Sequence, residues 1–431
     1  MARDSADPAG NRSRAVREGD RPRADEAIES FGSGWDIYEI AVSDAPHARW
    51  KRIREMSPVF DAGEGVFFVS DWNLVNAVLR DPRHGAGAGV SASFGASEGL
   101  AFEAMRVWLM SLDGDPHARA RGLVRRSFTP RRVDSIRGLI VQSCDACVAD
   151  IEATPAGECV DLVEKLAFRL PSEVIRSLFG FPREQWSLEV ESRLRNDEAR
   201  AGIELIESLA VFFEDCLKSG RVPAGLLADL RVPDDECGVL SDLEVLANAV
   251  LLVTAAIDTT AGLIGNAVLC LLERPELAGR LRVESGLAPR VVEETLRFEP
   301  PALSCSRSAG MDFELGGVEI PAGSQLLLGL AAANRDPARY SNPDVFDVDR
   351  DHSQLISFGG GRHFCLGAAL ARLEAQLAIE RLFDSADLSL ELIEKPVWQK
   401  RNPTVRSLAS LRVRVGRRQH AGRGAHARRR S

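Results

Sequence analysis

Apolar residues along this chain recur mainly at the three- and four-residue spacing of amphipathic helices. This spacing predicts helices over residues 48–56, 71–80, 162–179 and 203–217. The most apolar stretch, residues 243–272, is predicted to be a long helix that crosses the middle of a large protein, because nearly all of its faces are apolar. Residues 65–70 and the segment 304–323, with a Gly-Gly turn inside it, are predicted to be strands.

Composition and charge narrow the classes of function. The 431 residues carry a formal net charge of −9, which argues against generic nucleic-acid binding. The most continuous apolar run, residues 245–257, is short for a bilayer and contains Asn248 and Thr254, and the N-terminus lacks the apolar core of a signal peptide. A cytoplasmic protein without a membrane span is therefore expected. Residues 1–30 are predicted to be a disordered tail, and residues 417–431 a second, basic tail.

Eight cysteines are spread thinly over the chain, unlike the dense spacing of a disulfide framework. They stand at positions 144, 147, 159, 216, 237, 270, 305 and 365. Cys365 differs from the others because it ends a glycine-rich loop and stands just before a predicted helix. Free N–H groups and the positive dipole end at a helix start favour a thiolate, which is the form that binds metals.

The loop around Cys365 reads Phe358-Gly359-Gly360-Gly361-Arg362-His363-Phe364-Cys365-Leu366-Gly367. Three consecutive glycines allow positive φ and a close approach to a flat, bulky group. One interpretation makes Cys365 a small buried residue in a turn. A dinucleotide-phosphate loop does not fit, because Phe364 stands where that fingerprint requires glycine, and a zinc site lacks further ligands at the right spacing. An axial thiolate on haem iron requires one cysteine, flat access and N–H donors to sulfur.

Two other clusters carry candidate chemistry. His117 and Arg121 are four residues apart, so one helix face would carry two cationic groups that suit a bound dianion; the alternative is an exposed basic helix. Asp258 and Thr259 lie within the apolar segment 243–272, where an acid is costly unless it is paired. In the structural interpretation, Asp258 forms an ion pair with an arginine and the Thr259 hydroxyl donates to a carbonyl one turn earlier. In the functional interpretation, the two side chains relay protons to bound oxygen.

The motif Phe358-Gly359-x-Gly361-x-His363-x-Cys365-x-Gly367 resembles the haem-binding signature of the cytochrome P450 monooxygenases, in their soluble bacterial form, and the resemblance extends over residues 34–415. It implies a mainly α fold with a smaller β-rich region, in a single large domain over residues 31–416. It also implies haem b, with Cys365 as the axial iron ligand and His363 bound to a propionate. The other positions that the resemblance assigns to cofactor binding are His117, Arg121, Arg307, Phe358, Gly359 and Gly367.

The resemblance also assigns roles on the distal side of the haem. Asp258 and Thr259 match the family's acid–alcohol pair, which delivers protons to oxygen on iron. Ala256 stands where the family usually has glycine, and its methyl group bears on how far the helix opens a groove for oxygen. The expected substrate contacts are Phe94, Leu100, Val250, Leu251, Thr254, Leu303, Ser304 and Val405.

Two further features concern the fold and the electron supply. Glu294 and Arg297 match a buried Glu-x-x-Arg anchor of the family, with Arg350 as the expected third member, so they are expected to serve the fold and not catalysis. A basic patch on the proximal side is expected to dock an acidic ferredoxin or flavodoxin that passes electrons from NAD(P)H. Its arginines are Arg119, Arg125, Arg126, Arg131 and Arg132.

The implied function is that of a haem-thiolate monooxygenase. Such an enzyme would insert one oxygen atom from O2 into a small, largely apolar substrate, by hydroxylation or epoxidation, in bacterial secondary metabolism or catabolism. A monomer is expected. Two alternatives stay open: a peroxide-driven peroxygenase, against which the Asp258-Thr259 pair argues, and a non-enzymatic haem sensor or carrier.

Overall fold

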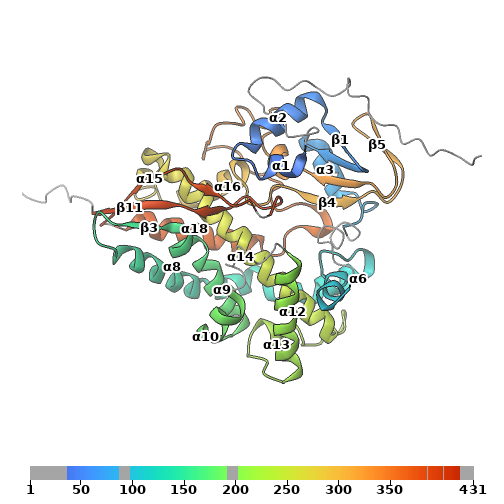
Figure 1. Cartoon of the computed structure of the whole chain (residues 1–431), viewed down its shortest axis with the longest axis horizontal. Coiled ribbons are helices and arrows are strands. Elements are labelled where there is room, and N and C mark those ends of the chain that lie inside the picture. Colours follow the sequence, from blue (N-terminus) through green and yellow to red (C-terminus); the bar gives the residue numbers. More distant parts are fainter. Residues whose placement is uncertain (1–35, 87–97, 192–201, 386, 401, 418–431) are drawn as a thin grey trace, which may run out of the picture.

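The computed structural model describes residues 36–86, 98–191, 202–385, 387–400 and 402–417. These residues form one domain with a helical part and a smaller strand-rich part, which confirms the predicted fold class. Figure 1 shows the N-terminal helices and strands at one end of the molecule and the longer helices at the other.

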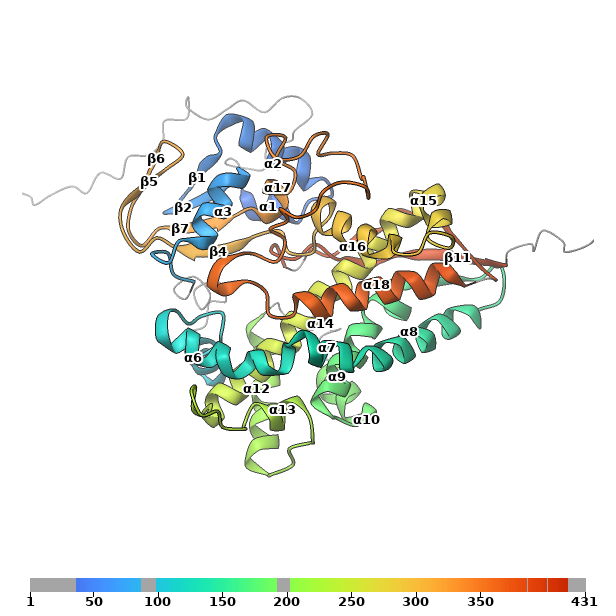
Figure 2. The ribbon, with the colours of Figure 1, turned by 180° about the vertical axis from the view of Figure 1, so that it is seen from behind.

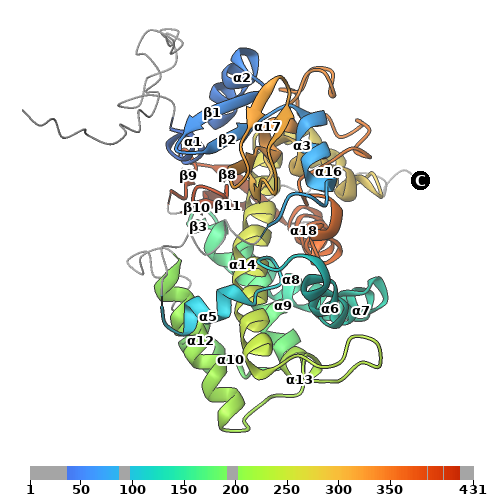
Figure 3. The same cartoon turned by 90° about the vertical axis from the view of Figure 1, so that its right-hand side faces the viewer.

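Helix α14 (Asp242–Leu272) runs through the middle of the molecule (Figure 3). It begins with a capping box, in which the Ser241 hydroxyl accepts from the Glu244 N–H and the Glu244 carboxylate accepts from the Ser241 N–H. Its length and composition would allow it to cross a bilayer, but 72% of its most apolar window is buried inside the protein. It is therefore the central core helix that the sequence predicted.

Other helices surround α14. Those in direct contact with it are α5 (Leu100–Arg106), the π-helical turn η2 (Val163–Ala167), α9 (Arg169–Phe179), α12 (Ile203–Lys218), α15 (Pro275–Arg280), α16 (Leu287–Phe298) and α18 (Ala368–Asp384). The remaining helical segments are α1 (Ile37–Ala41), α2 (Pro46–Met56), α3 (Trp72–Arg80), α6 (Gly114–Arg125), η1 (Arg126–Phe128), α7 (Pro130–Ser135), α8 (Arg137–Glu152), α10 (Arg183–Trp186), η3 (Ser187–Glu191), α13 (Leu226–Asp229), α17 (Leu330–Ala333) and η4 (Gly361–His363). The four helices predicted from spacing are thus confirmed as α2, α3, η2 with α9, and α12.

The strands form small sheets. The largest has the order β1-β2-β7-β4 and combines β1 (Val59–Gly63), β2 (Val66–Val69), β7 (Gln325–Leu328) and β4 (Cys305–Ser308). Its β2–β7 pair is parallel and its other pairs are antiparallel. The smaller sheets are β3 (Cys159–Asp161) with β11 (Arg412–Arg417) and β8 (Leu388–Leu392), the hairpin β5 (Phe313–Leu315) and β6 (Val318–Ile320), and the pair β9 (Val397–Trp398) and β10 (Leu408–Ser410).

The predicted boundary at the C-terminus requires a correction. Arg417 is the last residue of β11 and pairs with Leu388 of β8, so it belongs to the sheet and not to a tail. The basic composition predicted a tail at this residue, but its pairing with a strand that is distant in sequence places it in a sheet. The rest of the predicted tails, residues 1–30 and 418–431, lies outside the described residues.

Helix α18 carries an acid in the protein core. Glu374 is buried, and its Oε2 atom has no hydrogen-bond partner among the described residues. Burial away from water disfavours the charged form and raises the pKa of Glu374 to about 8. The side chain is therefore a neutral carboxylic acid at pH 7.

Glu374→Gln is expected to flatten the pH dependence of stability. The carboxyl group of the unfolded chain ionises near pH 4.5, whereas folded Glu374 keeps its proton until about pH 8. Between these values the folded state binds the extra proton, so the free energy of unfolding falls by up to about 1.4 kcal/mol per pH unit as the pH rises. Urea unfolding at roughly pH 5.5 and 7.5 should show a larger loss for the wild type than for the variant. Equal losses would contradict the assignment, and exposed Glu276→Gln is the control.

Candidate active site

The glycine-rich loop before α18 has the backbone that the sequence predicted. Gly359 and Gly361 have φ values of 69° and 65°, in the left-handed region that favours glycine. A Cβ atom on Gly361 would also collide with the carbonyl oxygen of Leu79 at the end of α3. The Cys365 N–H donates to the carbonyl of Phe358 at 3.0 Å, which closes the loop. These contacts fix where the loop presents the cysteine.

The Cys365 thiol is accessible but lies deep within this loop. Desolvation by the surrounding protein raises its pKa, although the backbone N–H groups of Gly367 and Ala368 and the nearby cations of Arg121 and Arg372 act in the opposite direction. The N–H groups at the helix start favour the thiolate, as the sequence predicted, but desolvation of the thiol outweighs their effect on the pKa. Ionisation at neutral pH requires a stronger positive partner, such as a coordinated metal ion.

A cluster of basic side chains gathers beside the loop. His117 of α6 lies against His363, with 4.2 Å between the ring centroids, and Arg121 donates to the Phe364 carbonyl at 2.6 Å. Burial lowers the pKa of His363, and the nearby cation of Arg307, a buried residue of β4, acts in the same direction. The structure thus brings together the four basic residues that the sequence singled out from three separate segments.

His117 is the buried, unsatisfied member of this cluster. Only 3% of its surface is exposed, and its Nε2 atom has no hydrogen-bond partner among the residues described. Burial, followed by the positive neighbours His363 and Arg121, lowers its pKa to about 4. The ring is therefore neutral at pH 7 and has a nitrogen free to bond to a ligand.

Two residues of the cluster were missed by the sequence analysis. The Asp113 carboxylate, which precedes α6, lies 3.2 Å from His363 Nε2, 3.4 Å from Arg362 Nε and 2.8 Å from the Ala86 N–H. Arg362 also donates to the Pro82 and His84 carbonyls, each at 2.8 Å. His363 lies 250 residues from Asp113, and Arg362 lies about 280 residues from Pro82 and His84, so no local motif could have revealed these contacts.

The central turn of α14 faces an opening. Ala255 is exposed in the middle of a helix whose other residues are mostly buried, and Asp258 and Thr259 are partly exposed. The Thr259 hydroxyl donates to the Ala255 carbonyl at 2.7 Å, which is the local bond of the structural interpretation. The helix is continuous through Ala256.

The expected substrate contacts differ in how much of their surface is exposed. Phe94 lies outside the described residues, and Leu100, Leu251, Thr254 and Ser304 are partly exposed. Val405 is 9% exposed and forms an isolated β-bridge with Ala302.

Val250 and Leu303 require a correction. Val250 has no exposed surface, and Leu303 packs in a core cluster with Ile37 and Trp50. Neither side chain has surface available to a substrate, because packing against other elements takes up the apolar face that the sequence assigned to a pocket.

The Glu-x-x-Arg pair is buried, as the resemblance implied. Arg297 Nη2 and Nε donate to the Glu294 carboxylate at 2.6 and 2.9 Å, and both side chains are fully buried. Arg350 lies 3.8 Å from the same carboxylate, whereas His352, which the sequence analysis missed, lies at 2.9 Å. Burial alone would raise the pKa of Glu294, but the hydrogen bonds from Arg297 and His352 lower it overall.

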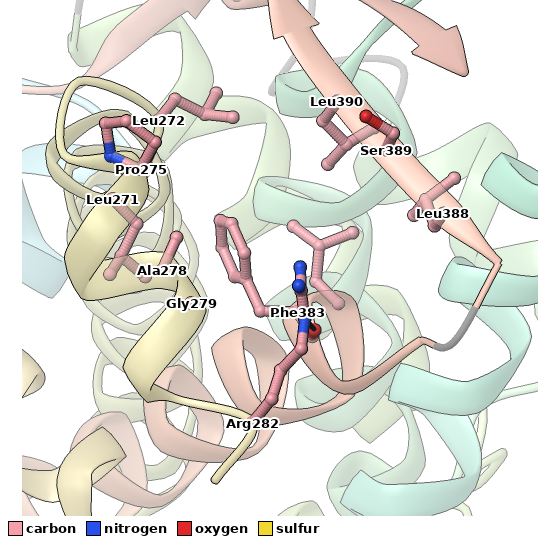
Figure 4. A pocket seen from close by; sticks show the side chains of 11 residues that line it. Leu271, Leu272, Pro275, Ala278, Gly279, Arg282, Phe383, Leu388, Ser389 and Leu390 are labelled. Atoms are coloured by element: carbon pink, nitrogen blue, oxygen red, sulfur yellow. Dashed lines mark hydrogen bonds between the residues drawn. The ribbon is translucent and has the colours of Figure 1, made fainter. Parts of the chain in front are cut away.

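A separate pocket of about 240 Å³ lies where α14, α15, α18 and β8 meet (Figure 4). Its lining is mainly aliphatic, and Arg282 on its wall donates to the Phe383 carbonyl at 2.7 Å. None of the candidate site residues lines it. It is therefore distinct from the site around Cys365.

Comparisons with known proteins agree with this arrangement. Residues 204–405 match the family model described as Cytochrome P450. The chain is 33% identical to the cytochrome P450 monooxygenase PikC of Streptomyces venezuelae over 88% of this chain and 93% of PikC. It is 37% identical to the vitamin D(3) 25-hydroxylase of Pseudonocardia autotrophica over 72% and 78%. The structure of the myxobacterial cytochrome P450 CYP267B1 with myristic acid superposes with a TM-score of 0.78 and 29% identity, over 89% of this chain and 99% of that one.

Proposed function

This chain belongs to the cytochrome P450 family of monooxygenases, and on that premise we propose that it inserts one oxygen atom from O2 into a small, largely apolar organic substrate. The observation that carries the proposal is the accessible thiol of Cys365 at the start of α18, beside basic groups from α6, β4 and the cysteine loop. The reaction would be a hydroxylation or an epoxidation, in bacterial secondary metabolism or catabolism.

The residues around Cys365 fit haem. Members of this family bind haem through a cysteine thiolate, and the bound group activates O2 for transfer of one oxygen atom to carbon. We assign the iron ligand to Cys365, and the propionate contacts to His117, Arg121, Arg307 and His363. The unpartnered Nε2 of buried His117 supports this fit, because a buried polar atom requires a partner.

Proton delivery is assigned to Asp258 and Thr259. A hydroxyl can donate one proton while it accepts another, and a nearby carboxyl group can resupply it. The bond from the Thr259 hydroxyl to the Ala255 carbonyl holds that proton on the helix until a better acceptor is present. The exposure of Ala255 supports access to this turn. We propose that the methyl group of Ala256 narrows, but does not close, the space beside it.

The substrate is proposed to be largely apolar. Leu100, Leu251, Thr254, Ser304 and Val405 remain as candidate contacts, and most of these offer carbon surface that favours burial of an apolar ligand. The vitamin D(3) 25-hydroxylase and the complex with myristic acid show that relatives bind apolar compounds, which supports the same class for this chain.

Electrons are proposed to come from NAD(P)H through a separate ferredoxin or flavodoxin. Figure 2 shows α6, α7 and α18 on one side of the molecule. Three arginines of the predicted basic patch are already paired: Arg119 with Glu244, Arg126 with Asp234 and Arg132 with Asp229. Arg125 and Arg131 are exposed, and within the described part of the chain neither forms an ion pair. We therefore narrow the docking patch to these two residues and propose a cytoplasmic monomer.

Two other classes of haem protein would use the same fold. A peroxygenase would take its oxygen from hydrogen peroxide and would not need Asp258 and Thr259. A sensor or carrier would bind haem without forming product. The presence of an accessible acid–alcohol turn on α14 favours the monooxygenase.

The absorption spectrum of the reduced protein with carbon monoxide tests the central assignment. The wild type should show a Soret band far to the red of an imidazole-ligated haem, because the sulfur ligand donates electron density to iron. Cys365→Ala should abolish this band, and Cys159→Ala, at an exposed site on β3, should retain it. Haem uptake without the red shift, or no haem uptake by the wild type, would refute the assignment.

Thr259→Ala should uncouple electron use from product formation. Loss of the hydroxyl is expected to lower product per NAD(P)H by about 10²-fold, with hydrogen peroxide released in its place. Thr259→Ser, which keeps a hydroxyl, should recover most of the yield. Product formation by Thr259→Ala at the wild-type yield would contradict the role of Thr259 in proton delivery. Full activity of the wild type with peroxide alone would favour the peroxygenase.

The double variant Arg125→Glu/Arg131→Glu should slow reduction by an acidic ferredoxin. The rate at low ionic strength is expected to fall by about tenfold, and its dependence on salt should weaken, because electrostatic steering is screened by ions. Arg412→Glu, at an exposed arginine on strand β11, is the control. Stopped-flow reduction at several salt concentrations measures both effects, and unchanged kinetics would argue against this docking site.

A further inference from the structure

Two segments that are distant in sequence form one structural unit beside α14. The Leu303 N–H donates to the Thr404 carbonyl at 2.9 Å, and the Arg406 N–H donates to the Pro301 carbonyl at 2.7 Å. The isolated bridge between Ala302 and Val405 lies between these bonds. The segment after α16 and the turn before β10 therefore hold each other in register.

Helix α14 packs closely on this unit. A Cβ atom on Gly262 would lie 2.9 Å from Pro301 Cβ and 3.1 Å from the Arg406 carbonyl oxygen, so only glycine allows this approach without a shift. Fully buried Asn266, one turn further on, donates to the Glu299 carbonyl at 2.9 Å and to the Arg406 carbonyl at 3.1 Å. Since Asp258 precedes Gly262 by one helical turn, the unit has a fixed position relative to the proposed proton relay.

An ion cluster with little exposed surface joins the same two segments through their side chains. Glu299 Oε1 lies 3.0 Å from both Arg406 Nε and His47 Nε2, and Arg335 lies 3.9 Å from the other carboxylate oxygen. Burial would raise the pKa of Glu299, but His47, Arg406 and Arg335 lower it to about 2, so the carboxylate is charged at neutral pH. A buried charge of this kind is tolerated only when its partners are held in place.

Arg406 has further contacts that fix its orientation. Its two Nη atoms donate to the carbonyls of Ser43 and Asp44 at 2.8 and 3.0 Å. Its guanidinium stacks on the Trp398 ring, 3.6 Å from the centroid. Lysine could keep the charge at this position but could not reproduce the planar set of donors.

We propose that Glu299 and Arg406 are positioning residues that set the shape of the substrate pocket, by locking the segments that carry Ser304 and Val405 to each other and to α14. The proposal rests on the proposed function, because it takes these two segments as parts of the pocket wall. Neither residue is among the candidate haem or substrate contacts, so each would act through the backbone segments that it holds. Through the shape of the pocket, the cluster would determine which apolar substrates bind and which of their carbon atoms lies near the iron.

Azole ligands of two sizes test this proposal by optical titration of the haem-loaded protein. Imidazole is small, and 4-phenylimidazole needs a shaped apolar pocket as well as the iron. Glu299→Gln and Arg406→Lys are expected to leave the reduced carbon monoxide spectrum and the Kd of imidazole unchanged, and to weaken 4-phenylimidazole by roughly tenfold or more. Glu284→Gln, which alters an ion pair outside this unit, should change neither ligand.

The other outcomes overturn the proposal. Equal weakening of both azoles, or no change in either, would show that the cluster does not shape the pocket. Failure of both variants to incorporate haem would make the cluster a folding determinant only. Failure of the proposed function is seen separately, because the wild type would then lack the red-shifted carbon monoxide band before any variant is compared.

Discussion

The buried charge pair of Glu294 and Arg297 is the constraint on which the position of the cysteine loop depends. Neither side chain has exposed surface, so each charge requires the other and a full set of hydrogen bonds. Glu294 accepts from the Asp347 N–H at 2.8 Å, and Arg297 donates to the Pro343 and Val345 carbonyls at 2.7 and 2.9 Å. Removal of one partner from such a pair typically costs about 3–5 kcal/mol. The pair therefore ties α16 to the long irregular segment that leads into the loop.

The loop in turn controls the chemistry of its cysteine. Gly361 packs closely on the end of α3, which fixes the position of the loop that carries Cys365. Desolvation by the surrounding protein raises the pKa of the Cys365 thiol. The N–H groups of the helix start oppose this shift without overcoming it. A thiol in such a position has little thiolate at neutral pH, which lowers its reactivity as a free nucleophile.

Helix α14 relates this proximal side to the proposed pocket. Its central turn carries Asp258 and Thr259. Gly262, one turn later, and Asn266, two turns later, contact the unit built around Glu299 and Arg406. Two ion clusters, the buried pair of Glu294 and Arg297 and the partly exposed cluster around Glu299, thus hold irregular backbone against regular helices. Irregular segments form few backbone–backbone hydrogen bonds. Their carbonyl and N–H groups bond instead to charged side chains, whose geometry fixes the path of the segment.

The sequence by itself determined the features that depend on neighbouring residues. Helical spacing located α2, α3, η2 with α9, and α12, and a continuous apolar run located α14. The glycines and Cys365 located the loop, because local backbone preferences are encoded over a few positions. Tertiary structure decided what depends on distant partners. It brought Asp113 to His363 and His352 to Glu294, packed Leu303 into a core, and set the direction of the Cys365 pKa shift. Burial and contacts between distant residues arise only when the chain has folded, so they cannot be predicted from the spacing of residues along the sequence.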